Sequence, residues 1–440
     1  MYYYKRLIIA GVLLAQYAAV AQQPTDTLRI SLNEAWQKAE AHSRQIEITQ
    51  KSLNMADEEV KDTRLERLPE IGITGSAEKA SNLAIYEKGI FAPVTQQHEV
   101  IHTLYRFGTD FYLNIYNGNK LNLQLEANKL LQRIAEIKNE ETRSNIRYKT
   151  STLYLDLQRS LIFRDLITSD IADQEKQLRE IKAMQKNGTV LKSDVLRVEL
   201  DLSKRKMTLV TIENDILIGT QKLNIIMGEP DNRIIQPTVF EPGAAAQDDY
   251  NKYLATALEH SFSYHISEEQ TKLSKTNLKK VKSNVLPKVG MYGEFYYANP
   301  QIFLFPYNPA WYSLGVTGIK VSMPVSALYH NTHKVRAAKL ELEKEEVMHH
   351  DTEDKVRQQV WEAYLRYKES LVQIQVATDN VAQAEENARI IRNNYFKQTA
   401  LITDLLDADV QLLRTRFELA AARIMAQDKF YLLQNTIGVL

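Results

Sequence analysis

The stretch that decides the fold is Thr399-Ala400-Leu401-Ile402-Thr403-Asp404-Leu405-Leu406-Asp407-Ala408. A counterpart lies earlier in the chain, Thr189-Val190-Leu191-Lys192-Ser193-Asp194-Val195-Leu196-Arg197, and the two align without a gap at a spacing of 210 residues. Long sequence without proline enters and leaves each stretch. We therefore predict two long helical hairpins, with these stretches at their tips.

The tips belong to an internal repeat that covers most of the chain. Matching motifs occur in the same order in both halves, first at a spacing of 218 residues and then at 210. One register could arise by chance similarity between two helices, but two registers in order indicate a true repeat. The matches are His42-Ser43 with His260-Ser261, Leu68-Pro69 with Leu286-Pro287, Gly72 with Gly290, Tyr154-Leu155 with Tyr364-Leu365, Asp194 with Asp404, and Gly228 with Gly438.

Composition excludes several classes of function. The 440 residues carry 55 basic and 55 acidic side chains without a dense basic block, which argues against a nucleic-acid partner. No cysteine is present, so disulfides, thiolate metal sites and a cysteine nucleophile are excluded. The His349-His350-Asp351 cluster is better explained as a solvated helix face than as a metal site. We expect no metal, no cofactor, no catalytic residues and no enzymatic activity.

The N-terminus has the pattern of a secretory signal peptide. Lys5-Arg6 precede an apolar run, and Ala19-Val20-Ala21 is a small-x-small cleavage site, which predicts a cleaved peptide over residues 1–21. The alternative is an uncleaved anchor. No later stretch has about 18 consecutive apolar residues, so no transmembrane helix is expected after it.

Each repeat is predicted to contain a helix, two strands, a very long helix and a returning helix. The long helices, at about 119–186 and 332–397, would each reach roughly 100 Å, which is too long for a globular core. The expected divisions are repeat one at 22–228, with strands about 70–84 and 104–116 and a tip about 187–194; a linker at 229–249; and repeat two at 250–440, with strands about 288–298 and 311–325 and a tip about 396–407. The first helices are expected at about 32–67 and 251–285.

The four strands favour an assembly. Two hairpins in one chain leave exposed sheet edges, which natural proteins avoid. Three copies would supply twelve strands, enough for a small closed barrel. Along residues 311–325 the apolar side chains alternate with polar ones, and the alternation shifts by one residue at Gly318, where we expect a β-bulge. A periplasmic coiled-coil scaffold without a channel is the main alternative.

In this order, the motifs resemble the TolC-like outer-membrane efflux proteins. The resemblance rests on the predicted signal peptide, the tandem repeats, the Leu-Pro motif before the first strand of each repeat, and the tip turns followed by Ser-Asp or Thr-Asp. Residues 314–325 look like that family's strand-to-helix junction, and residues 404–408 like its second tip signature. The resemblance covers about residues 28–438. The residues carried over as structural strand–helix junctions are Pro69, Gly72, Pro287, Gly290 and Pro324.

The resemblance implies a mainly α protein with four β-strands that forms a homotrimer. Its strands would make a twelve-stranded barrel in the outer-membrane lipid of a diderm bacterium, and its helices a tube in the periplasm. Such a duct would be passive and gated, and would receive substrates from a periplasmic adaptor protein and an inner-membrane pump of RND, ABC or MFS type. Residues 229–249 would wrap the equator of the tube.

The resemblance also implies roles for residues at the tips. Asp404 and Asp407 share a helix face, and six such carboxylates in a trimer would form a pore constriction that favours cations. The alternative for Asp404 is a helix cap. Asp194 and Tyr395 occupy the positions of a gate latch, for which plain packing of Tyr395 is the alternative. The family's arginine position is Ala400, and Arg392 and Lys397 are nearby substitutes.

Overall fold

The computed structural model describes residues 27–238, 249–301 and 308–440. The predicted signal peptide, residues 239–248 of the predicted linker and residues 302–307 lie outside this description. The chain forms two compact units. One contains residues up to Gln50, Ile137–His265 and Asp351–Leu440, and the other contains Lys51–Glu136 and Ile266–His350. Each unit therefore takes segments from both repeats.

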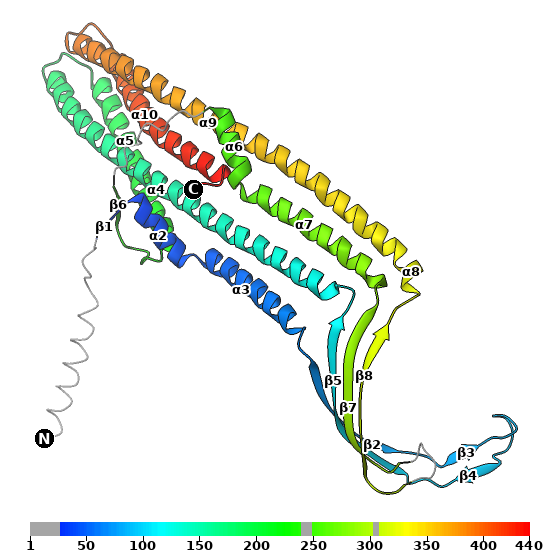
Figure 1. Ribbon diagram of the computed structural model, residues 1–440. Coiled ribbons are helices and arrows are strands. Elements are labelled where there is room, and N and C mark those ends of the chain that lie inside the picture. The colour runs from blue at the N-terminus through cyan, green and yellow to red at the C-terminus, as the bar shows by residue number, and fades with distance from the viewer. Residues whose placement is uncertain (1–26, 239–248, 302–307) are drawn as a thin grey trace, which may run out of the picture. The chain divides into compact units, whose positions relative to one another are not determined.

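Two helical hairpins dominate the first unit (Figure 1). The first joins α4 (Lys120–Lys186) to α5 (Lys192–Met227), and the second joins α9 (Thr332–Phe396) to α10 (Ile402–Thr436). Buried side chains at three- and four-residue steps on α5, such as Val195, Val198 and Leu202, explain why the hairpins pack. Phe163 of α4 meets Phe417 of α10 with ring centroids 4.6 Å apart, so α4 contacts both its own partner and the second hairpin.

The helix that opens each repeat is broken, contrary to the single helix expected. The first is divided into α2 (Leu32–His42) and α3 (Arg44–Leu65), and the second into α6 (Tyr250–His260) and α7 (Phe262–Lys282). The breaks fall at Ser43 and Ser261, where the backbone is extended. Ser31 and Glu34 form a capping box at the start of α2.

The breaks bring distant motifs of the repeat together. Gly228, with φ 73°, lies against His42, and Gly438, with φ 80°, lies against His260. A Cβ at residue 438 would come within 2.2 Å of the carbonyl oxygen of His260. The positive φ and the close approach both require glycine, which explains why these matched positions share it.

The second unit contains a four-stranded antiparallel sheet in the order β2-β5-β7-β8 (Figure 1). Its strands are β2 (Glu70–Lys79), β5 (Thr103–Tyr116), β7 (Lys288–Asn299) and β8 (Tyr312–Ser322). β2 therefore ends before the predicted residue 84, and β8 before residue 325. Pro69 and Pro287 directly precede β2 and β7, and Pro324 lies between β8 and the short helix α8 (Ala327–His330).

The expected bulge at Gly318 is wrong. The pairing of β7 with β8 runs in unbroken register from Lys288 opposite Ser322 to Ala298 opposite Tyr312. Gly315 instead lies beneath the ring of Phe295, and Gly318 beneath that of Tyr292. The apolar residues of β8 change face without a bulge because glycine makes room for these rings. The register does shift in β5, between Asn114 and Tyr116.

Smaller elements complete the described chain. β1 (Leu28–Ile30) pairs in parallel with β6 (Ile235–Pro237), which lies inside the predicted linker. β3 (Leu83–Ile85) pairs with β4 (Gln96–His98), and the 3-10 helix Ser283–Val285 precedes β7. Among the described residues, no helix is both long enough and apolar enough to cross a membrane.

Candidate functional site

The two hairpin tips have the same local geometry. The backbone N–H and the hydroxyl of Thr189 both donate to the carbonyl of Met184, at 3.0 and 2.8 Å. Thr399 makes the same two bonds to the carbonyl of Asn394, at 2.9 and 3.0 Å. Gly188 before the first threonine has φ 76°. Local sequence therefore determines both turns.

The matched aspartates cap the returning helices. The N–H of Leu191 donates to Asp194 at 3.3 Å, and the N–H of Leu401 donates to Asp404 at 3.2 Å. A carboxylate in the first turn also interacts favourably with the helix dipole. This is the capping alternative that the sequence left open for Asp404. Both Asp404 and Asp407 are exposed, and within the described chain Asp407 has no hydrogen bond or ion pair.

Tyr395 lies in a core that the two tips share. It is 5% exposed and packs with Ile181 and Val195 of the first hairpin and Leu405 of the second. Its hydroxyl has no hydrogen-bond partner among the described residues. Burial raises the pKa of Tyr395, and the charge of Asp194 raises it further. Tyr395 therefore packs as a core residue close to Asp194, without a bond between them.

Sequence reasoning missed a buried carboxylate, Asp409. It is 2% exposed, and its Oδ1 accepts from Nη2 of Arg392 at 3.0 Å. Its Oδ2 accepts from the side-chain amides of Gln174 at 3.0 Å and Gln177 at 3.1 Å. The sequence contains a signal for this ion pair. Arg392 and Asp409 lie 17 residues apart and have opposite charges. At the repeat spacing of 210 residues they correspond to Lys182 and Glu199, which also have opposite charges.

A second buried charge cluster lies in the first hairpin. Arg205, whose side chain is 4% exposed, forms ion pairs with Asp170 of α4 and with Asp201, the latter at 2.7 Å. Burial raises the pKa of Asp170, Arg205 opposes this, and the charge of Asp409 adds to it. Arg205 lies among the buried apolar side chains of α5, where its positive charge neutralises these carboxylates.

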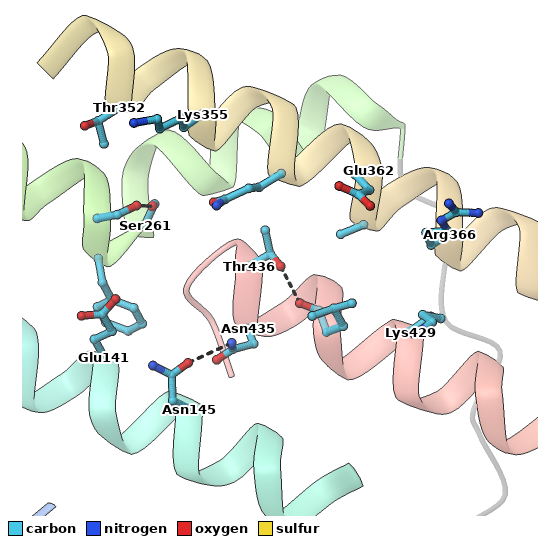
Figure 2. Close-up of a pocket in the computed structure, with 15 residues that line it drawn as sticks. Glu141, Asn145, Ser261, Thr352, Lys355, Glu362, Arg366, Lys429, Asn435 and Thr436 are labelled. Atoms are coloured by element: carbon cyan, nitrogen blue, oxygen red, sulfur yellow. Dashed lines mark hydrogen bonds between the residues drawn. The ribbon is translucent and has the colours of Figure 1, made fainter. Parts of the chain in front are cut away.

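A polar cleft of about 760 Å³ lies elsewhere in the first unit, and Figure 2 shows the residues that line it. It is formed by α4, the break between α6 and α7, α9 and the end of α10. Asn435 donates to Asn145 across it at 3.2 Å (Figure 2). Within the described chain, no group of three or more histidine and acidic side chains is placed to hold a metal ion. His349, from the cluster considered in the sequence, instead forms a hydrogen bond with Ser267 at 2.8 Å.

The predicted junction glycines, Gly72 and Gly290, are the third residues of β2 and β7 and lie close to the start of each strand. A Cβ on Gly72 would come within 2.9 Å of the carboxylate of Asp110, and one on Gly290 within 2.5 Å of the hydroxyl of Tyr112. Both positions therefore leave space for a side chain of the neighbouring strand, β5.

Comparison with known proteins agrees with this architecture. The family model described as outer membrane efflux protein matches residues 255–439. The outer-membrane channel OprN is 14% identical, with a TM-score of 0.77 over 93% of this chain and 90% of that one. The outer membrane protein VceC of Vibrio cholerae is 16% identical, with a TM-score of 0.76 over 92% and 96%. The outer membrane channel CmeC of Campylobacter jejuni is 13% identical, with a TM-score of 0.75 over 93% and 85%.

No protein in the search of curated sequences matches the chain. The structural matches cover more than nine-tenths of the chain, and at this level of identity they establish its fold. The matched family model is described as outer membrane efflux protein, and the structural matches include outer-membrane channels. The resemblance to the TolC-like outer-membrane efflux proteins is therefore confirmed, by the family model over residues 255–439 and by the fold over the described chain.

Proposed function

We propose that three copies of this chain form a passive, gated channel in the outer membrane of a diderm bacterium. The channel receives substrates from a periplasmic adaptor and an inner-membrane pump and releases them outside the cell. The observation that carries this proposal is the sheet. Its outer strands, β2 and β8, have no strand partner on their free edges among the described residues, so β8 of one copy can pair with β2 of the next.

The two faces of the sheet support a barrel. Cross-strand register places Ile73, Thr109, Phe295 and Gly315 on one face and Thr74, Gly108 and Glu294 on the other. The first face is apolar and exposed, with Ile73 at 77%. The second carries charge, because Arg106 pairs with Glu294 and lies 3.9 Å from the centroid of the Tyr296 ring. Apolar-out and polar-in alternation is the pattern of a strand between lipid and a wet lumen.

The first unit also has apolar surfaces that suit neighbouring copies. α5 and α9 both expose large apolar side chains at intervals of three, four or seven residues. A buried helix seam has this spacing. The exposed residues with this spacing are Leu196, Leu200, Met207, Val210 and Leu217 on α5, and Trp361, Leu365, Val372 and Val376 on α9.

The proposal includes the tip residues. Asp404 and Asp407 from three copies would form the cation-favouring constriction. Asp404 also caps its own helix, so its side chain would serve both roles. Asp194 and Tyr395 would act as the latch by keeping the two tips packed together, and the hydroxyl of Tyr395 would gain a partner only in the assembly.

Purified protein tests the main proposal. We expect a heat-stable trimer from the outer-membrane fraction that conducts ions in planar lipid bilayers. A soluble periplasmic protein that does not conduct would contradict the channel and support the scaffold alternative.

A matched pair of substitutions tests which face of the sheet meets lipid. Ile73→Lys places a charge on the apolar face, where a lysine at mid-membrane costs about 2–4 kcal/mol. Thr74→Lys places the same charge one residue along, on the polar face. We expect the first variant to lose membrane insertion and the second to retain it with altered ion selectivity. Equal insertion of both would contradict the assignment of faces.

Asp404→Asn combined with Asp407→Asn tests the constriction. Removing six carboxylates from a trimer should lower the preference for cations and the block by multivalent cations, as measured from reversal potentials in salt gradients. Glu418→Gln is the control, because it removes an exposed carboxylate of α10 that lies away from the tip. Unchanged selectivity in the double variant would remove the proposed constriction role.

A further inference from the structure

Asp409 connects the two repeats through polar contacts inside the packed helices. Its carboxylate accepts from Arg392 of α9 and from Gln174 and Gln177 of α4. Gln174 and Gln177 are 1% and 4% exposed. One oxygen of the carboxylate therefore has a charged donor and the other has two neutral donors, so the buried charge is satisfied on both sides.

The equivalent pair in the first repeat has no such role. Lys182 and Glu199 form an ion pair at 2.7 Å, but their side chains are 49% and 41% exposed. Exposed pairs contribute little to stability, whereas removing one partner of a buried pair leaves an unsatisfied group. The equivalent positions therefore differ between the repeats. In the first repeat they form a surface ion pair, whereas in the second repeat the carboxylate is buried and contacts the first hairpin.

The contacts define which helices can separate. Arg392 and Asp409 belong to the same hairpin, so they move together if that hairpin moves. Gln174 and Gln177 belong to the other hairpin, and their bonds to Asp409 would break when α10 leaves α4. Movement of the second hairpin would therefore remove two amide donors from the carboxylate and leave its ion pair intact.

We propose that Asp409 is the positioning residue of the gate: with Gln174 and Gln177 it locks the second hairpin, as one unit, against α4. The lock lies at the start of α10, beside the tip where Ala400 stands instead of a charged residue. It rests on the proposed channel function, because its release would open the periplasmic end. In the resting channel this carboxylate holds the two hairpins of each chain together, in addition to the proposed latch of Asp194 and Tyr395.

Conductance of single channels in planar bilayers tests the lock. Asp409→Asn keeps the shape of the side chain but replaces an acceptor oxygen by a donor amide that faces two other amides. We expect at least about a tenfold rise in basal open probability, because hydrogen bonds to a charged group are lost from the closed state alone. Glu199→Gln, the equivalent change in the first repeat, is the matched control and should stay close to the wild type.

Gln174→Met combined with Gln177→Met provides a second test that leaves the ion pair of Arg392 and Asp409 intact. We expect this variant to open the channel as well, because it removes the contact between hairpins only. If Asp409→Asn and the double methionine variant both conduct like Glu199→Gln, the lock is wrong.

Hydrogen exchange of the backbone amides separates the lock from the channel proposal. In Asp409→Asn, amides of residues 402–410 should exchange about tenfold faster than in the wild type, while those at the far end of α10 should not change. Uniformly faster exchange along α10 would indicate a general loss of packing and overturn the positioning role. A wild type that never conducts would defeat the channel proposal, yet local exchange would still decide whether the lock exists.

Discussion

The two hairpin tips have the same turn, yet they differ in where their charges lie. In the first hairpin the buried Arg205 pairs with the partly buried Asp170 and Asp201, and the pair Lys182–Glu199 is on the surface. The second hairpin has Asn380, Thr415 and Gln411 at the positions of Asp170, Arg205 and Asp201. Its buried carboxylate is Asp409. A shared local sequence thus produces the same turn, while the neighbours of each helix determine which charges are buried.

The largest expected effect comes from removing the cation of the first cluster. Arg205→Ala leaves the partly buried Asp170 and Asp201 without a counterion, which should destabilise the helical unit by up to about 3–5 kcal/mol. Thr415→Ala, the equivalent change in the second hairpin, should cost about 1 kcal/mol because it removes a local hydrogen bond to the carbonyl of Leu412. Urea unfolding followed by circular dichroism measures both, and equal losses would contradict the buried-charge explanation.

Substitution of a glycine that ends a repeat should reduce stability more than substitution of a glycine in a tip turn. Gly438→Ala places a Cβ against the carbonyl of His260 at a positive φ, so we expect a loss of about 2–4 kcal/mol. Gly188→Ala has the same kind of φ, but the space around it is open, so the loss should be about 1 kcal/mol. Thermal unfolding of the two variants checks this order. A larger effect at residue 188 would show that the close approach at residue 438 does not constrain the helix end.

The pH dependence of stability should distinguish Asp170 from Asn380, its equivalent in the second repeat. Burial raises the pKa of Asp170 above its ordinary value of 3.8, so the folded chain binds this proton more tightly than the unfolded chain. The contribution of Asp170 to stability therefore falls as pH rises through the window between those two values, by about 1.4 kcal/mol per unit of pKa difference.

Asp170→Asn removes this titration. Relative to the wild type, the variant should become more stable as pH is raised from about 3 to 7. Urea unfolding at several pH values gives the difference directly. A constant difference across this range would show that Asp170 titrates as it does in the unfolded chain.

The smallest expected effect is at the turn itself. Gln398, with φ 64°, occupies the position of Gly188, with φ 76°. A residue with a Cβ is disfavoured in this conformation, so Gln398→Gly should stabilise the second tip by up to about 1 kcal/mol. Local hydrogen exchange in residues 394–404 checks this, and slower exchange in the variant is expected. Faster exchange would mean that the Gln398 side chain contributes contacts that outweigh the strain.

The sequence by itself determined the features that depend on local rules. The long helices without proline, the tip turns and the Leu-Pro motifs before β2 and β7 follow from short-range preferences, and comparing the sequence with itself shows that they recur at a spacing of about 210 residues. The capping of α10 by Asp404 was also available as an alternative because its spacing from Leu401 is local. Such features are readable because they need only residues within a few positions of one another.

Only the tertiary structure decided which residues are buried. Asp409 and Glu199 have the same place in the repeat, and nothing in their neighbouring sequence shows that Gln174 and Gln177 will enclose one of them. The change of apolar phase at Gly318 similarly indicated a bulge, whereas β8 pairs in regular register and the rings of Phe295 and Tyr292 fill the space above Gly315 and Gly318. In both cases the deciding partner lies on another element, so burial and packing required the folded chain.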